Sequence, residues 1–190
     1  VHAALDGAEA PHGAARVLVN CAGIVHAIRI VDKEGNAHPL DAYRRTIEVN
    51  LVGTFNMISK FAARLSGAGG DGEEAGVVAT TASVAAYDGQ IGQAAYASSK
   101  GGVVGLTLPA ARDLAQHRIR VVSIAPGIFL TPMLMGLPPA AQESLGKQVP
   151  HPSRLGHPDE YAQLVESIVA NPMLNGEVIR LDGAIRMAPR

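Results

Sequence analysis

Residues 76–126 decide the fold, and they read GVVATTASVAAYDGQIGQAAYASSKGGVVGLTLPAARDLAQHRIRVVSIAP. An almost wholly small or apolar run covers residues 76–82, and a similar run covers residues 119–124. Strands that are buried on both faces of a parallel sheet have this composition. Residues 96–117 lie between the two runs and have a helical pattern, which supplies the crossover that parallel strands need. The stretch therefore predicts a β-α-β unit with parallel strands.

The rest of the chain continues this alternation of helices and short buried strands. Further helices are expected at residues 1–10, 40–65 and 159–170, and further strands at residues 16–20 and 177–181. Loops are expected at residues 30–39 and at residues 128–156, a proline-rich segment with short helical pieces. Together these elements predict an α/β fold, a Rossmann-like doubly wound parallel sheet with helices on both faces.

Charge and cysteine content exclude several classes of protein. The 190 residues carry 16 Lys and Arg against 17 Asp and Glu, and the resulting net charge of −1 argues against a nucleic-acid binder with a broad basic surface. Cys21 is the only cysteine, so neither an internal disulfide nor a cysteine-rich metal cage can form. The histidines form no HExxH pattern, and no apolar run approaches the ~20 residues of a membrane-spanning helix. We therefore expect no metal site and no membrane contact.

A glycine-rich stretch imitates a nucleotide-binding motif. Gly67, Gly69 and Gly72 have the spacing G-x-G-x-x-G, in which glycines admit a pyrophosphate to a helix N-terminus. That chemistry requires a strand before the motif and a helix after it. Here the order is reversed, because the stretch follows an expected helix and precedes the strand at residues 76–82. We interpret it as a flexible loop.

The strongest chemical signal is the spacing of Tyr96 and Lys100. Side chains four residues apart share one face of a helix, so a phenol and an ammonium can address one site. A nearby cation stabilises the phenolate and lowers its pKa, which makes Tyr96 a candidate general acid or base. Ser83 follows a strand at the edge where parallel sheets bind ligands, and its hydroxyl can hydrogen-bond a substrate oxygen. The plainer alternatives are a solvated helix face for the pair and a loop-start cap for Ser83.

Ser83, Tyr96 and Lys100 together resemble the catalytic set of the short-chain dehydrogenase/reductase family. Three further segments match the pattern of that family in the same order along the chain, namely Asn20-Cys21-Ala22-Gly23, Asn50, and Pro126-Gly127 with Thr131. The first resembles the N-A-G turn of the family, with a cysteine in it. The second resembles a helix asparagine that holds a water in a proton relay, and the third resembles the segment that lies against the nicotinamide.

Longer stretches narrow the resemblance. Residues 81–115, 148–165 and 175–187 are similar to the type 2 3-hydroxyacyl-CoA dehydrogenases within the family. The resemblance implies a homotetrameric enzyme that uses NAD to oxidise the 3-hydroxyl of a 3-hydroxyacyl-CoA reversibly to the 3-oxoacyl-CoA. The open alternatives are a 3-oxoacyl-acyl-carrier-protein reductase, a hydroxysteroid dehydrogenase, and a non-catalytic scaffold subunit. The intact catalytic set weighs against the scaffold.

The resemblance also implies a role for each matched residue. Tyr96 is the base, Lys100 tunes it and binds the nicotinamide ribose, Ser83 positions the substrate hydroxyl, and Asn50 completes the catalytic set. The residues implied to bind NAD are Cys21, Ala22, Gly23, Tyr96, Lys100, Pro126, Gly127, Phe129 and Thr131. The residues implied to bind the substrate are Ser83, Gln90 and Tyr96, with segment 130–150 beside the acyl pocket. No histidine partner for Cys21 is evident, so we interpret its thiol as packed and partly buried rather than nucleophilic.

The start of the chain departs from the family pattern. Members begin with a strand, a glycine-rich turn and an acidic residue that selects NAD over NADP, and none of these is present before Val1. We therefore expect residues 1–190 to form a single short-chain dehydrogenase domain that is incomplete at the N-terminus, with the first strands of the sheet missing. A chain that truly begins here would expose an apolar strand edge at residues 17–19. The arginine- and alanine-rich composition predicts a bacterial-like, cytoplasmic protein.

Overall fold

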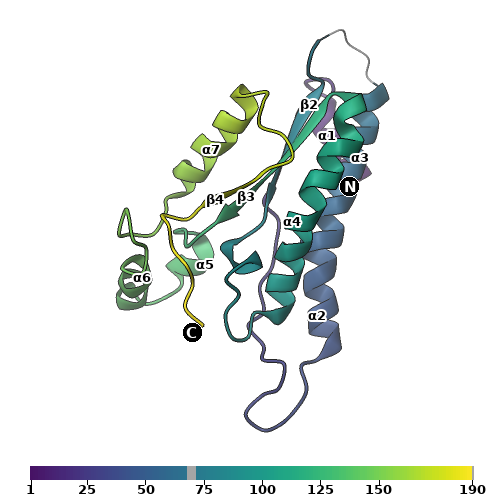
Figure 1. Cartoon of the computed structure of the whole chain (residues 1–190). Helices are drawn as coiled ribbons and strands as arrows, with labels where there is room; N and C mark the ends of the chain where they lie inside the picture. The colour runs from purple at the N-terminus through teal and green to yellow at the C-terminus, as the bar shows by residue number, and fades with distance from the viewer. Residues whose placement is uncertain (68–71, 190) are drawn as a thin grey trace.

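The computed structural model describes residues 1–67 and 72–189, and the four strands within them form one parallel sheet (Figure 1). The strands are ordered β1 (Val17–Asn20), β2 (Gly76–Thr81), β3 (Ile119–Pro126) and β4 (Val178–Leu181). In the register, Leu18 pairs with Val78 and Val78 pairs with Val121. The prediction of an α/β fold with a parallel sheet is confirmed, and the β-α-β unit of residues 76–126 supplies its two central strands.

Helices fill the connections between the strands. Their bounds are α1 (His2–Glu9), α2 (Leu40–Ile47), α3 (Gly53–Gly67), α4 (Ala94–Leu114), α5 (Pro132–Met135), α6 (Pro139–Gly146) and α7 (Pro158–Ala170). A π-helical segment, Glu48–Val52, joins α2 to α3, so the helix expected over residues 40–65 is one run with a wider turn in its middle. The short helices α5 and α6 confirm the helical pieces expected in the proline-rich segment. Of the glycine-rich stretch, Gly69 lies outside the described residues.

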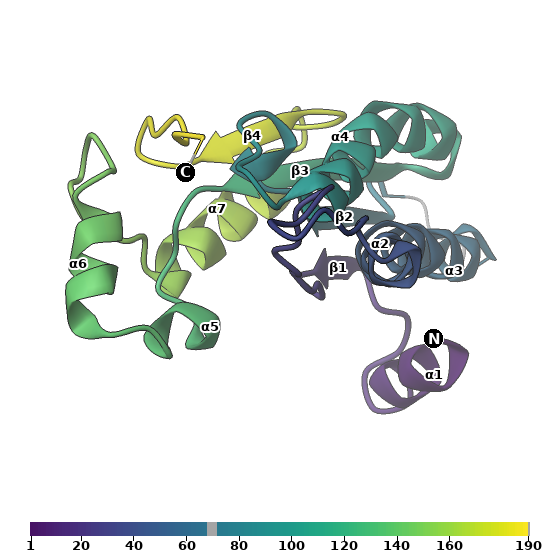
Figure 2. The ribbon, with the colours of Figure 1, turned by 90° about the horizontal axis from the view of Figure 1, so that it is seen from below.

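The helices cover both faces of the sheet, with α3 and α4 on one side and α7 on the other (Figure 2). Phe61 of α3 packs in a buried cluster with Val78 of β2 and Val121 of β3. Ile168 of α7 packs in a second cluster with Val77 of β2. Consecutive residues of β2 therefore point to opposite faces, as the pleat of a strand requires. The near-continuous apolar sequence of β2 reflects burial on both sides.

The strand β1 departs from the expected burial on both faces. Leu18 and Asn20 are buried, whereas Val17 and Val19 are 47% and 42% exposed. Leu18 joins the cluster beneath α3, but α7 packs against β2 and leaves the same face of β1 uncovered. Val17 and Val19 therefore lie on an exposed face of the sheet.

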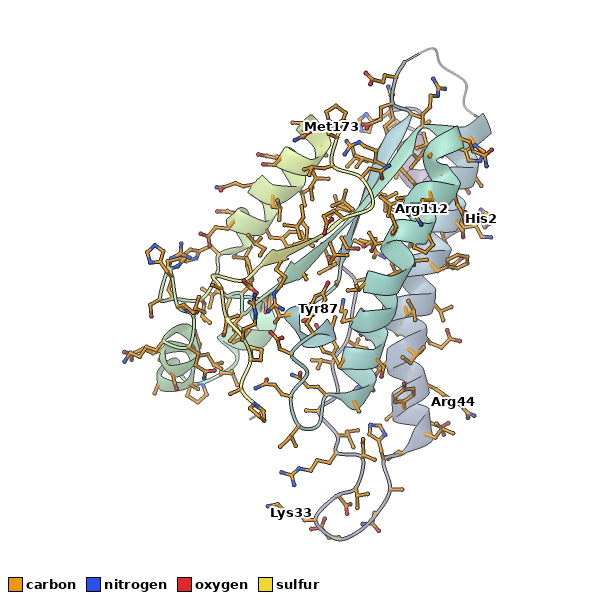
Figure 3. All side chains as sticks on the ribbon, in the orientation of Figure 1. His2, Lys33, Arg44, Tyr87, Arg112 and Met173 are labelled. Carbon is orange, nitrogen blue, oxygen red and sulfur yellow. The ribbon has the colours of Figure 1, made fainter. Side chains whose placement is uncertain are left out.

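The carboxyl ends of three strands bring the predicted site segments to one edge of the sheet. Strand β1 leads into Cys21, β2 leads to Ser83, and β3 leads to Gly127. The long loop between β1 and α2 extends beyond this edge, with Lys33 at its tip (Figure 3). Parallel sheets bind ligands at such an edge, because loops from several strands meet there.

Candidate active site

A cavity of about 640 Å³ lies at this edge and collects most of the predicted site residues. Its lining includes Cys21, Gly23, Ser83, Tyr96, Lys100, Pro126, Gly127, Phe129 and Thr131. Segments from four separate parts of the chain thus converge on one space, as the sequence predicts. The lining also includes the apolar residues Ile24, Val25 and Leu134.

Helix α4 places Tyr96 and Lys100 on the same face, toward the cavity. The Lys100 ammonium lies 5.8 Å from the centroid of the Tyr96 ring, and only 4% of Lys100 is exposed. The alternative of a solvated helix face is therefore wrong. A lysine is rarely so buried without a partner, and the Nζ atom of Lys100 donates a hydrogen bond to the carbonyl oxygen of Thr81, at 2.6 Å.

Ser83 has two roles in the structure. It is the N-cap of the short 3₁₀ helix Val84–Ala86, and its Oγ accepts the backbone N–H of Ala85 at 3.1 Å. The same side chain lies beside the Tyr96 hydroxyl and lowers the pKa of the phenol. The cap proposed as the plainer alternative is therefore present, and it fixes the serine oxygen beside the phenol rather than excluding a chemical role.

The pKa values in the cavity are set mainly by burial. Burial raises the pKa of the Tyr96 phenol, and the neighbouring Ser83 side chain lowers it by less. The expectation that Lys100 lowers this pKa is wrong for the structure as described. The ammonium donates its hydrogen bond to the Thr81 carbonyl, and desolvation of the phenolate is the largest influence on its pKa. Burial also lowers the pKa of Lys100 to about 8, while the neighbouring Cys21 raises it.

Asn50 lies behind the cavity, in the π-helical segment, and is fully buried. Its amide nitrogen donates to the carbonyl of Ile24 at 2.9 Å and to Ser99 Oγ at 3.0 Å, and its Oδ1 accepts the backbone N–H of Ile24 at 2.8 Å. These contacts tie the loop after β1 to helix α4. Asn50 therefore supports the site through its neighbours, while the proton-relay role implied by the resemblance stays a prediction.

Gly23 and Gly127 are sites of close approach. A Cβ atom on Gly23 would lie 3.3 Å from Asn50 Oδ1 and 3.6 Å from Lys100 Nζ. A Cβ atom on Gly127 would lie 2.9 Å from both Cα and Cβ of Asp182, which follows β4. Side chains at these positions would therefore crowd the polar groups behind the cavity and the packing of β3 against the end of β4.

Three predicted residues lie elsewhere or differ from expectation. Gln90 lines a separate groove, because the loop after Ser83 turns away and the Gln90 amide donates to the carbonyl of Ala188 at 2.9 Å. Ala22 is exposed beside the cavity and is absent from its lining. Cys21 is exposed rather than partly buried, because it follows the uncovered strand β1.

Sequence reasoning missed two polar residues of the cavity, Thr81 and Tyr161. Thr81 was assigned only to the strand, although its carbonyl oxygen is the partner of Lys100. Tyr161 comes from α7, where it occupies a position of the apolar stripe, and its hydroxyl lies 2.7 Å from Thr81 Oγ1. A tyrosine in such a stripe gives no signal that separates a core residue from a site residue.

Two features are absent from residues 1–67 and 72–189. No helix of this part of the chain is long and apolar enough to cross a bilayer. No group of three or more His, Cys, Asp or Glu side chains is placed there to hold a metal ion.

Comparison with known proteins places the chain in a family. The family model described as short chain dehydrogenase matches residues 1–142. The 3-hydroxyacyl-CoA dehydrogenase type-2 of Rattus norvegicus is 56% identical over 191 residues, which cover 100% of this chain and 73% of the rat protein. The Homo sapiens protein of the same name is 54% identical with the same coverage.

Solved structures agree. The crystal structure of 3-hydroxyacyl-CoA dehydrogenase type-2 from Mycobacterium avium is 40% identical, covers 99% of this chain and 74% of its own, and has a TM-score of 0.94. A 7α-hydroxysteroid dehydrogenase complexed with NADH and 7-oxo glycochenodeoxycholic acid is 28% identical, with 99% and 70% coverage and a TM-score of 0.85. This chain belongs to the short-chain dehydrogenase family.

Proposed function

We propose that this protein is an NAD-dependent dehydrogenase that oxidises the 3-hydroxyl of a 3-hydroxyacyl-CoA to the 3-oxoacyl-CoA, and also catalyses the reverse reduction. The observation that carries the proposal is the meeting of Ser83, Tyr96 and Lys100 in one cavity, where Ser83 lies close enough to Tyr96 to lower the pKa of its phenol. The identity of 52–56% to proteins named 3-hydroxyacyl-CoA dehydrogenase type-2 supports the substrate class.

The cavity fits the nicotinamide end of NAD. Gly23 and Gly127 follow β1 and β3 at the cavity; a Cβ atom on Gly23 would crowd Asn50 and Lys100, and one on Gly127 would crowd Asp182. Phe129 and Thr131 line the same cavity, and they would hold the nicotinamide and its carboxamide. Lys100 offers its ammonium to the ribose hydroxyls. Bound NAD supplies the hydride acceptor of the reaction.

Side chains of the protein position the substrate hydroxyl and transfer its proton. The hydroxyl of Ser83 positions the substrate oxygen, and the Tyr96 phenolate accepts its proton as the bond to hydrogen at C3 breaks. Because burial raises the pKa of Tyr96, the phenolate is scarce near neutral pH. Oxidation should therefore accelerate with rising pH. In the reverse direction the protonated Tyr96 is already the dominant form and donates to the developing alkoxide.

Apolar residues of the cavity would contact the acyl part of the substrate. Ile24, Val25 and Leu134 are apolar residues of the cavity lining, and Leu134 belongs to the 130–150 segment expected beside the acyl pocket. The same apolar residues could contact a steroid. The likeness to a 7α-hydroxysteroid dehydrogenase makes a hydroxysteroid the second candidate substrate. Its lower identity, 28% against 40% for the mycobacterial structure, makes it the weaker one.

A substrate panel tests the proposal. We expect oxidation of NADH, followed by absorbance, with acetoacetyl-CoA as substrate. A 7-oxo steroid and an acetoacetyl thioester of acyl-carrier protein should turn over at least tenfold more slowly in kcat/KM. Higher kcat/KM for the steroid or the carrier-protein thioester would contradict the acyl-CoA assignment. A folded protein without turnover on any of the three would favour the non-catalytic scaffold. NADPH in place of NADH tests the cofactor choice.

We also propose that the protein is a homotetramer and that residues 1–190 belong to a single short-chain dehydrogenase domain. Gly101 and Gly105 of α4 have open space at their Cβ positions, and Phe55 of α3 and Leu108 of α4 are 56% and 44% exposed. Small and apolar residues on one pair of helices support packing against another subunit. Light scattering after size exclusion measures the mass, and a monomer at micromolar concentration would contradict the proposal. The cytoplasmic location stays a prediction.

A further inference from the structure

Tyr161 is the one aromatic side chain that α7 contributes to the lining of the cavity. Its ring packs beside the apolar cluster around Val77 and Ile168, and its hydroxyl extends past this cluster to the carboxyl end of β2. There the hydroxyl lies 2.7 Å from Thr81 Oγ1 and 3.8 Å from Cys21 Sγ. A tyrosine that served only to fill the core would not need these polar contacts.

Thr81 connects this hydroxyl to the catalytic lysine. Its side chain contacts Tyr161, and its carbonyl oxygen accepts the hydrogen bond from Lys100 Nζ at 2.6 Å. Thr81 is the last residue of β2; it pairs with Ile124 of β3 but has no partner in β1, where the pairing ends at Thr80. The Tyr161 hydroxyl is thus a lateral support for the residue that receives the Lys100 ammonium.

We propose that Tyr161 is a positioning residue for the dehydrogenase reaction: its hydroxyl holds Thr81 in place, and Thr81 in turn holds the Lys100 ammonium beside Tyr96. The link to catalysis rests on the proposed function, whereas the link between Tyr161 and Lys100 does not. Tyr161 forms no hydrogen bond with Tyr96 or Ser83, and of its two polar contacts, Thr81 and Cys21, only Thr81 is hydrogen-bonded to Lys100.

The surrounding titratable groups are compatible with this role. Cys21 lies at the end of β1 and contacts Tyr161, and Tyr96 and Lys100 belong to α4. On α7 itself, Glu160 is paired with Arg154. Burial raises the pKa of Tyr161, so the phenol stays protonated and can donate to Thr81 throughout the pH range in which the enzyme would work.

The first experiment measures the chemical reactivity of Lys100 and does not depend on turnover. The chain has only four lysines, Lys33, Lys60, Lys100 and Lys147, so acylation by acetic anhydride can be followed for each by peptide mass spectrometry. A carbonyl acceptor stabilises the ammonium, and its displacement favours the neutral, reactive amine. In Tyr161→Phe the midpoint of Lys100 labelling against pH should move down, and labelling at pH 7 should rise roughly threefold relative to the other lysines.

Matched variants separate positioning from simple loss of packing. Tyr43→Phe removes a phenol hydroxyl on α2, far from the cavity, and should leave the Lys100 midpoint unchanged. Thr81→Val removes the hydroxyl partner, so it should shift the midpoint as Tyr161→Phe does, and the double variant should add nothing further. Thr81→Ser keeps the hydroxyl and should restore wild-type labelling. An unchanged Lys100 midpoint in Tyr161→Phe, or full additivity in the double variant, would overturn the proposal.

The second experiment measures kcat and KM. With acetoacetyl-CoA and NADH, Tyr161→Phe should lower kcat roughly tenfold while KM for the thioester stays within twofold of wild type. A higher KM for the thioester with an unchanged kcat would contradict the positioning role. Absence of turnover in the wild type would refute the proposed function and leave the labelling result standing, so the two failures are distinguishable.

Discussion

Lys100 should make the folded protein less stable at neutral pH, and its replacement should reveal by how much. Only 4% of the residue is exposed, and burial lowers its pKa from 10.5 to about 8. Between these two values the unfolded chain binds a proton that the folded chain does not. Unfolding therefore takes up protons in this window, and stability rises as the pH increases through it.

The size of the effect follows from the two pKa values. A difference of one unit corresponds to about 1.4 kcal/mol, so the buried lysine costs on the order of 3 kcal/mol below pH 7. At pH 10 most of this cost has disappeared, because the unfolded lysine is also losing its proton. Lys100→Met removes the titration and leaves the Thr81 carbonyl without its donor at either pH. That loss is constant and cancels when the two pH values are compared.

Urea unfolding at pH 7 and pH 10 measures the effect. The free energy of unfolding of Lys100→Met minus that of the wild type should be more positive at pH 7 than at pH 10, by about 2 kcal/mol. Lys147→Met, which removes a side chain that is 70% exposed, is the matched control and should differ from wild type equally at both pH values. A difference for Lys100→Met that does not change with pH, or that grows toward pH 10, would refute the reasoning.

Other predictions concern the surroundings of the catalytic tyrosine and the end of β4. Ser83→Ala should lower kcat by roughly 10²-fold and cost about 1 kcal/mol of stability, because one oxygen both caps a helix and contacts the phenol; kinetics and urea unfolding measure the two effects separately. Gly127→Ala should destabilise the protein by about 1–3 kcal/mol in urea unfolding, since the new Cβ would lie 2.9 Å from the backbone of Asp182; an unchanged midpoint would contradict this. The hydrogen bond from Arg180, at 2.6 Å, lowers the pKa of Asp88, so this pair stabilises the protein above the ordinary carboxyl pKa and loses the effect as the pH falls through the lowered one. The Tm advantage of wild type over Asp88→Asn should therefore shrink on acidification below pH 4, and an advantage that persists at pH 2 would count against it.

The fold could be predicted because its two signals are local. The apolar runs of β2 and β3 and the helical pattern between them are properties of adjacent residues. Burial of β1 depends instead on which elements lie beside it, so the exposure of Val17 and Val19 could not be read from their apolar sequence. The π-helical turn around Asn50 likewise leaves no pattern that a period of 3.6 residues would detect.

The site was predictable where a motif carried it and not elsewhere. Ser83, Tyr96 and Lys100 lie together because strand ends and helix spacing fix their positions. Gln90 was misplaced because loop direction depends on distant contacts, here with Ala188. The direction of the Tyr96 pKa shift was also wrong, since sequence spacing shows the nearby cation but not the depth of burial.

The most direct test of the account is the turnover of Tyr96→Phe with acetoacetyl-CoA and NADH. The substitution removes only the hydroxyl that the mechanism uses to transfer the proton. We predict that kcat falls by roughly 10²–10⁴-fold, while NADH binding, measured by fluorescence, stays within threefold of wild type. Turnover that remains within threefold of wild type would contradict the assignment of Tyr96 as the acid and base of the reaction.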